Sequence, residues 1–142
     1  MPYLLDTNVV AEAMRAQPDT HVMTWLVAQS SAAVYLSVLT IGEIEQGIVR
    51  SAHPRRAERL RRWLHEDLIP GFGTRILAVD AAVMRQWGQI TGRASLQGRP
   101  VGLVDSLLAA TAITHGLILA NRNARDVAAL PVQTVNPWGE AS

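Results

Sequence analysis

Hydrophobic residues along the chain fall into short runs, separated by longer stretches in which apolar positions recur every three or four residues. The short runs predict β-strands at 2–5, 34–39, 75–79 and 117–120, with a further run at 132–135. The longer stretches predict helices at 20–28, 40–51, 55–68, 81–91 and 103–114. Strands that alternate with helices in this way predict an α/β sandwich with a mostly parallel sheet of four to five strands, flanked by helices.

Turn-forming residues mark the boundaries between these elements. Residues 6–8 (Asp-Thr-Asn) predict a turn after the first strand, because Asp and Asn side chains favour Asx-type turns. Residues 70–73 (Pro-Gly-Phe-Gly) and 96–100 predict loops, and Gly116 predicts the end of the last helix. No linker or repeat divides the chain, so we expect one domain over residues 1–142.

The composition narrows the chemistry that this chain can perform. It has no cysteine, which excludes disulfides, thiolate catalysis and sulfur-ligated zinc. All 13 basic residues are arginine, so a Walker A phosphate loop, a Schiff base and a kinase-type active site are excluded as well. The net charge of only +1 means that a polyanion would have to bind to a local patch.

The chain lacks the patterns of membrane and secreted proteins. Its mean hydropathy is +0.12, and no apolar run approaches the roughly 18 residues of a membrane span. Residues 1–6 lack the basic stretch and the long apolar segment of a secretory signal. We therefore expect a cytoplasmic protein that has no membrane partner.

Four acidic residues lie where a predicted strand ends or a predicted helix begins: Asp6, Glu43, Asp105 and Asp126. In open parallel sheets, ligands bind at the edge where the carboxyl ends of the strands meet. Each acid also has a structural interpretation. Asp6 would start the turn, and Glu43 would complete a capping box that Thr40 opens. Asp105 and Asp126 would stabilise the first turns of their helices.

Several carboxylates at one edge of a sheet repel one another, and either protonation or a bound cation relieves the repulsion. Mg²⁺ prefers oxygen ligands, needs one or two direct carboxylates and keeps several waters. Bound Mg²⁺ or Mn²⁺ promotes phosphodiester hydrolysis without a protein nucleophile. This chemistry agrees with a chain that has neither cysteine nor lysine.

Four motifs with these separations resemble the PIN-domain family, and more narrowly its VapC-type toxin ribonucleases. The motifs are LLDTNVV at 4–10, LSVLTIGEI at 36–44, DSLLAA at 105–110 and NRN at 121–123. The Asn136-Pro137-Trp138 ending is similar to the FitB-like branch of these toxins. The resemblance implies a three-layer PIN-like sandwich and a Mg²⁺- or Mn²⁺-dependent endoribonuclease. It also implies a homodimer that is silenced by a cognate antitoxin.

The motif match assigns Asp6, Glu43 and Asp105 as acidic site residues. We expect Asp6 and Asp105 to hold the metal, and Glu43 to act through water or as a base. By the same match, Thr7 and Asn8 support Asp6.

The fourth acidic position departs from the family pattern, in which an acid often follows a Thr-Arg pair. Here Asn123 follows Asn121 and Arg122. We expect Asn123 and Asp126 to complete the catalytic set by orienting water or other side chains rather than by binding the metal directly.

A dense basic cluster precedes and spans helix 55–68. Its members are Arg50, Arg55, Arg56, Arg59, Arg61 and Arg62. One interpretation is a solvated helix face that pairs with Glu58 and Glu66. The other is a surface that contacts RNA phosphates or the antitoxin.

Two other functions compete with the ribonuclease. A non-catalytic module could use the acidic edge to bind an arginine-bearing protein, as an antitoxin that inserts an arginine among the acids would also do. A phosphohydrolase of the haloacid-dehalogenase type needs a second Asp two residues after Asp6, and residue 8 is Asn. We also expect a homodimer, because the first helices carry more tryptophan and leucine than so short a chain buries easily.

Overall fold

A five-stranded parallel sheet forms the centre of the molecule. The structure is a computed structural model that describes residues 2–139. The strands lie in the order β3-β2-β1-β4-β5, and all four pairings are parallel. Their bounds are β1 Tyr3–Leu5, β2 Val34–Ser37, β3 Ile76–Leu77, β4 Ile118–Ala120 and β5 Thr134–Val135. The predicted α/β sandwich is confirmed, and the short run at 132–135 supplies the fifth strand.

The register of the central strands brings their carboxyl ends to one edge. Leu4 pairs with Tyr35 of β2 and with Leu119 of β4. The backbone N–H of Asp6 donates to the carbonyl of Ala120 at 2.9 Å. The residues that follow β1 and β4 are therefore neighbours in space, although they are more than a hundred positions apart in sequence.

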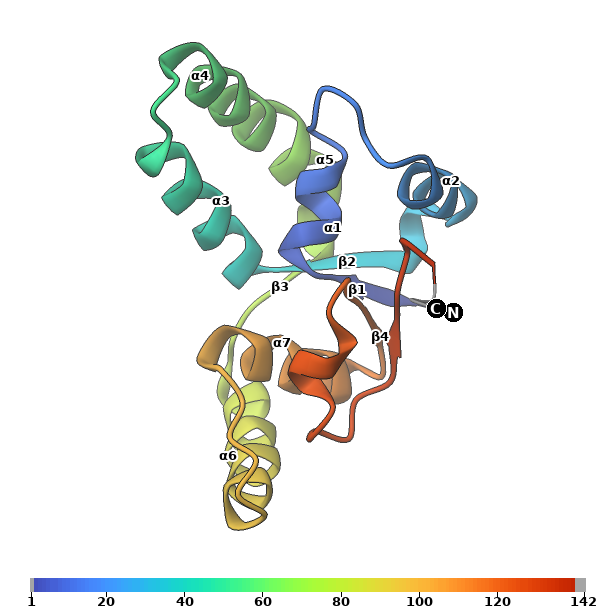
Figure 1. Cartoon of the computed structure of the whole chain (residues 1–142), viewed down its shortest axis with the longest axis vertical. Coiled ribbons are helices and arrows are strands. Elements are labelled where there is room, and N and C mark those ends of the chain that lie inside the picture. The colour runs from blue at the N-terminus through green and yellow to red at the C-terminus, as the bar shows by residue number, and fades with distance from the viewer. Residues whose placement is uncertain (1, 140–142) are drawn as a thin grey trace.

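Helices cover both faces of this sheet (Figure 1). The α-helices are α1 Thr7–Glu12, α2 Thr20–Ala28, α3 Val38–Arg50, α4 Pro54–Arg62, α5 Ile69–Phe72, α6 Ala81–Leu96 and α7 Leu103–His115. Shorter helical segments are η1 Ser31–Ala33, η2 Trp63–Leu68, η3 Gly73–Arg75 and η4 Ala124–Val127. In Figure 1, α6 and α7 lie on one side of the sheet and α1 to α5 on the other.

Alternation along the strands divides the interior into two hydrophobic cores. Leu4 and Leu119 pack in one core with Leu108 of α7. The next residues along the strands, Leu5 and Ala120, pack in the other core. Because successive strand side chains point to opposite faces, β1 to β4 each contribute to both cores, and the result is three layers.

Two helix boundaries agree with the local chemistry that predicted them. α2 spans the predicted 20–28, because the Asp19 side chain caps it by accepting from the N–H groups of His21 and Val22. α7 ends at Gly116, whose φ of +67° is the left-handed conformation that glycine tolerates best.

The prediction of a simple turn at residues 6–8 is wrong. Thr7 begins the six-residue helix α1, and Asp6 is its N-cap. The predicted loop at 70–73 is also wrong. The helix of α4 continues through the π-helical segment η2 into α5, which contains Pro70. The π-helical segment lies directly before α5, so the backbone hydrogen bonding is already shifted where proline cannot donate.

Two helices begin or end away from their predicted bounds. α3 begins at Val38 rather than Thr40, because the hydroxyl of Ser37 accepts from the N–H of Leu39 and caps it. α6 continues to Leu96, although Gly92 lies within it.

The surface shows apolar side chains other than those we expected. Trp25 is half-buried and meets the ring of Tyr3 edge to face, with centroids 4.9 Å apart. The exposed large apolar residues in the described range are Val27, Val38, Val49, Met84, Leu96 and Leu103. Tryptophans therefore do not supply the exposed surface from which a dimer was predicted. No helix within residues 2–139 is long and apolar enough to span a bilayer.

Candidate functional site

Asp6 lies at the carboxyl edge of the sheet, directly after the central strand β1. It is 8% exposed, and its carboxylate accepts a hydrogen bond from the backbone N–H of Thr7 at 2.6 Å. Burial raises its pKa to about 6, although the Thr7 hydrogen bond opposes the shift. The nearby charges of Asp105, Glu43 and Asp126 raise the pKa of Asp6 further.

Asp105 lies in the first turn of α7, three residues after the N-cap Gly102. It is therefore not the helix cap. Burial raises its pKa, and the charges of Asp126 and Glu43 add to the shift. The four predicted acids thus lie close enough to act on one another electrostatically, so the fold does bring them to one edge.

Thr7 connects Asp6 to Glu43, which comes from a different element. The hydroxyl of Thr7 donates to Oε1 of Glu43 at 2.5 Å and lies 3.2 Å from the hydroxyl of Thr40. Glu43 therefore does not reach back to the Thr40 amide, and it lies in the second turn of α3. The capping-box interpretation is wrong, because Ser37 caps the helix and Glu43 is directed to Thr7 instead.

Asp105 is anchored through its neighbour in α7. The hydroxyl of Ser106 accepts from the indole N–H of Trp87 at 2.9 Å and donates to the carbonyl of Leu103 at 2.9 Å. Ser106 is 1% exposed. This contact joins α6 to the first turn of α7 and so fixes the backbone that carries Asp105.

A network of asparagines joins the exits of β1 and β4. Asn121 is 2% exposed, and its Oδ1 accepts from Asn8 Nδ2 at 3.3 Å and from the backbone N–H of Asn123 at 3.0 Å. Asn8 supports this arrangement, but its Oδ1 is buried with no hydrogen-bond partner among the described residues. Sequence reasoning gave Asn121 no role, although a polar residue directly after a buried strand was a usable signal.

Asn123 and Asp126 lie on the exposed side of the edge. Asn123 occupies the N-cap position of η4, but its side chain makes no capping hydrogen bond. Asp126 is exposed, and the charge of its carboxylate contributes to raising the pKa of both Asp6 and Asp105. Asp126 lies in the first turn of η4, as predicted, but no side-chain cap precedes it.

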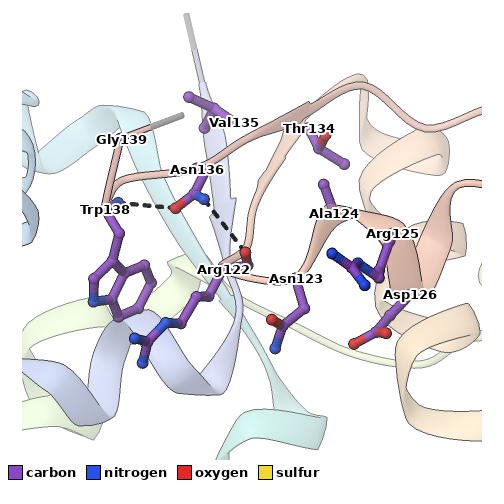
Figure 2. A pocket seen from close by; sticks show the side chains of 10 residues that line it. All are labelled: Arg122, Asn123, Ala124, Arg125, Asp126, Thr134, Val135, Asn136, Trp138 and Gly139. Carbon is purple, nitrogen blue, oxygen red and sulfur yellow. Dashed lines mark hydrogen bonds between the residues drawn. The ribbon is translucent and has the colours of Figure 1, made fainter. Parts of the chain in front are cut away.

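An open groove of about 900 Å³ begins at Asn123 and Asp126 (Figure 2). The loop after β4 forms one wall, and the segment 134–139 forms the other. Oδ1 of Asn136 accepts from the N–H of Trp138 at 2.9 Å, and its Nδ2 donates to the carbonyl of Arg122 at 3.4 Å. These bonds join the two walls.

The acidic edge offers oxygen ligands but no closed metal cage. Within residues 2–139, no three Asp, Glu or His side chains are arranged closely enough to enclose an ion on their own. Carboxylates whose pKa is raised by their neighbours gain from a nearby cation, and Mg²⁺ needs only one or two of them directly. The donors present therefore fit Mg²⁺ or Mn²⁺ that retains water.

Residues 3–131 match the PIN domain. The chain belongs to the PIN-domain family. It is 35% identical to Toxin FitB of Neisseria gonorrhoeae over 135 residues, which cover 95% of this chain and 97% of that protein. It is 31% identical to VapC ribonuclease Y4jK of Sinorhizobium fredii, over 97% of this chain and 99% of that protein.

A solved structure agrees with the assignment to the PIN domain. The crystal structure of FitAcB from Neisseria gonorrhoeae matches with a TM-score of 0.91 and 34% identity. The match covers 96% of this chain and 98% of that one. The family and fold implied by the sequence motifs are thereby confirmed.

One member of the arginine cluster of this PIN domain, Arg56, lines a cavity of about 430 Å³ with Thr7 and Glu43 of the acidic edge. On α4, Arg61 pairs with Glu58 at 2.9 Å, and Arg62 lies 3.7 Å from the same side chain. Together with Arg55 and Arg59, Glu58 and Arg62 line a separate, shallow groove. The pairs with Glu58 agree with the predicted solvated helix face, whereas Glu66 forms no ion pair with an arginine within residues 2–139. Surface pairs of this kind contribute little stability.

Proposed function

We propose that this PIN domain is a Mg²⁺- or Mn²⁺-dependent endoribonuclease, and that it acts in the cytoplasm as the toxin of a toxin–antitoxin pair. The observation that carries the proposal is the meeting of Asp6, Glu43, Asp105 and Asp126 at one sheet edge, where burial and mutual charge raise the pKa values of Asp6 and Asp105. The names of similar proteins, which include a VapC ribonuclease and a toxin, support it.

Each residue of the edge has a role in this proposal. Asp6 and Asp105 would hold the cation, which when bound would polarise a phosphoryl oxygen and activate water. Glu43, which accepts a hydrogen bond from the Thr7 hydroxyl, would act through water or as a base. Asn8 fixes the start of α1, and Asn123 and Asp126 orient the groups on the open side.

The test is cleavage of single-stranded RNA by the purified chain in Mn²⁺, in Mg²⁺ and in EDTA. We expect new RNA ends with either cation, none in EDTA, and none from the Asp6→Asn or Asp105→Asn variant. Full activity in EDTA, or in both variants, would overturn the metal mechanism.

The partner we propose is an antitoxin that inserts an arginine among the four acids. A guanidinium donates paired hydrogen bonds to carboxylates and would displace the cation from the same charges. A pull-down with the product of the upstream gene, followed by its Arg→Ala variants, tests this. Inhibition that survives every such variant would place the contact elsewhere.

We also propose a homodimer, in line with the family resemblance. Light scattering at micromolar concentration should give twice the 15.5 kDa of one chain. A single-chain mass would contradict it.

The second candidate, a non-catalytic module for an arginine-bearing protein, is favoured by one observation. The described Asp, Glu and His side chains do not by themselves enclose an ion, whereas an acidic edge suits a guanidinium. Binding of Mn²⁺ in the absence of any partner would distinguish the enzyme from this module.

A further inference from the structure

Arg122 extends from the loop after β4 and stacks on Trp138. The guanidinium carbon lies 5.0 Å from the centroid of the indole ring, a cation–π contact. Figure 2 shows the side chains of Arg122, Asn123 and Asp126 extending from the same side of this loop. A cationic side chain is thus held beside two of the proposed site residues.

The backbone beneath this pair is fixed by Asn136. Its side chain donates to the carbonyl of Arg122 and accepts from the N–H of Trp138. The two stacked residues come from segments that follow different strands, β4 and β5, and Asn136 bonds to both segments. The backbone of Arg122 is therefore held by a hydrogen bond, and its side chain is held by contact with the Trp138 ring.

The charge of Arg122 is not used within the described structure. Neither Arg122 nor Arg125 has a carboxylate within 4.0 Å among residues 2–139. The groove that they line contains one described acid, Asp126. The described lining of the groove therefore carries a net positive charge, although the edge beside it is acidic. This charge favours an anion that approaches the acids from the groove.

Stacking leaves the binding groups of arginine available. A cation–π contact with the indole ring uses none of the five N–H donors of the guanidinium. Holding the side chain on the ring reduces the rotamer entropy that binding would otherwise cost. The result is an oriented fork, which matches the geometry of a phosphate.

We propose that Arg122, held on Trp138, binds a backbone phosphate of single-stranded RNA next to the bond that is cleaved, and so sets where the strand lies on the edge. This inference rests on the proposed function and extends it to a substrate-positioning residue. The groove favours RNA as the occupant because Asn123 and Asp126 line it, and Asp126 lies near enough to Asp6 and Asp105 for its charge to act on both.

Binding of a 20-nucleotide mixed-sequence RNA tests the proposal. The measurement uses the Asp6→Asn background in EDTA, with gels to check that the RNA stays intact. The logarithm of the binding constant falls linearly with the logarithm of the salt concentration. For a single strand, loss of one phosphate contact makes this slope less steep by about 0.7. We therefore expect Arg122→Ala to weaken binding about tenfold at 50 mM salt and about threefold at 200 mM.

Three further variants separate the stacked fork from simple charge. Arg93→Ala removes one exposed arginine on α6 that lines a different cavity, and it should leave affinity and slope unchanged. Arg122→Lys keeps the charge but loses the planar fork, so we expect an intermediate affinity. Trp138→Phe keeps an aromatic ring and should retain most of the binding, with thermal unfolding of every variant as the check on folding.

Steady-state cleavage by the protein without the Asp6 substitution gives an independent reading. Arg122→Ala should raise KM about tenfold at 50 mM salt and leave kcat within about threefold. A lower kcat with unchanged RNA affinity would overturn the proposal and place Arg122 in the chemistry itself. Unchanged affinity and slope would also overturn it, as would an Arg122→Ala defect confined to antitoxin binding.

The two proposals fail in distinguishable ways. If the unsubstituted protein never cleaves RNA but Arg122→Ala weakens RNA binding as expected, the ribonuclease is wrong and the phosphate contact stands. If cleavage is normal and Arg122→Ala has no effect on binding, slope or KM, the ribonuclease stands and the phosphate contact is wrong.

Discussion

The two sides of the carboxyl edge of the sheet differ in burial and in bonding. On the side of β1 and α3, Asp6 is buried, and Thr7 donates hydrogen bonds to both Asp6 and Glu43. On the side of β4 and β5, Arg122 and Asp126 are exposed and line an open groove. We call these the buried side and the open side.

This difference indicates a division of work. Carboxylates that are desolvated and held by hydrogen bonds are constrained in position. A bound cation relieves the repulsion between them, so cation binding is favoured. Exposed side chains around an open groove can meet a long flexible ligand without a lid. We therefore propose that the buried side performs the chemistry and that the open side binds the RNA strand.

Removing a carboxylate from the buried side should have the largest effect. We expect Asp6→Asn to lower RNA cleavage by more than the roughly 100-fold that loss of a supporting group costs. Initial rates with saturating Mn²⁺ test this. A loss below tenfold would mean that Asp6 is not among the direct ligands.

Removing the hydrogen bond between Thr7 and Glu43 on the buried side should have the next largest effect on cleavage. Thr7→Val removes the hydroxyl that Glu43 accepts from, while the shape of the side chain is nearly unchanged. We expect cleavage to fall about 10–100-fold. Thr7→Ser keeps the hydroxyl and is the matched control. Equal activity of the two variants would show that Glu43 needs no positioning.

Asp126 on the open side should matter less than Asp6. We expect Asp126→Ala to slow cleavage about tenfold at saturating Mn²⁺, since its exposed carboxylate acts on the buried acids through its charge. A total loss, equal to that of Asp6→Asn, would make Asp126 a direct ligand. An unchanged rate would leave it without a role at this edge.

The last effect is on the stability of the fold rather than on cleavage, and it depends on pH. The pKa of Asp6 in the folded chain is about 6, above its ordinary 3.8. The native state therefore holds more protons than the unfolded state between pH 4 and 6, and the metal-free protein loses stability as the pH rises through that window. The loss is at most about 3 kcal/mol and is complete above pH 7.

Urea unfolding in EDTA from pH 4 to 8 measures this contribution. Asp6→Asn lacks the titrating group, so we expect its stability relative to the unsubstituted chain to increase between pH 4 and 6 and then to stay constant. A difference that does not change with pH would show that burial of Asp6 costs nothing.

Sequence patterns predicted the layers and the acids but missed short-range detail. Aliphatic runs and a good cap at Asp19 were sufficient for the strands and for α2. Asp and Asn, the residue types at positions 6 and 8, are common in turns. Because α1 has only six residues, it is also too short to give a periodic pattern of apolar positions, and it was not predicted. The π-helical segment before Pro70 depends on tertiary packing, which local propensity does not describe.

The contacts that define the two sides span long sequence distances. Thr7 and Glu43 are 36 positions apart, and their hydrogen bond exists only because β1 and β2 pair in parallel. The stacking of Arg122 on Trp138 needs β5 to lie beside β4. Motif spacing suggested which residues belong to the edge but not which of them bond to each other.

Titration with Mn²⁺, without RNA or antitoxin, tests the division of work most directly. Calorimetry should detect binding to the unsubstituted chain and equally to Arg122→Ala, but none to Asp6→Asn or Asp105→Asn. If Asp6→Asn binds Mn²⁺ as well as the unsubstituted chain does, or if Arg122→Ala loses binding, the assignment of metal chemistry to the buried side is contradicted.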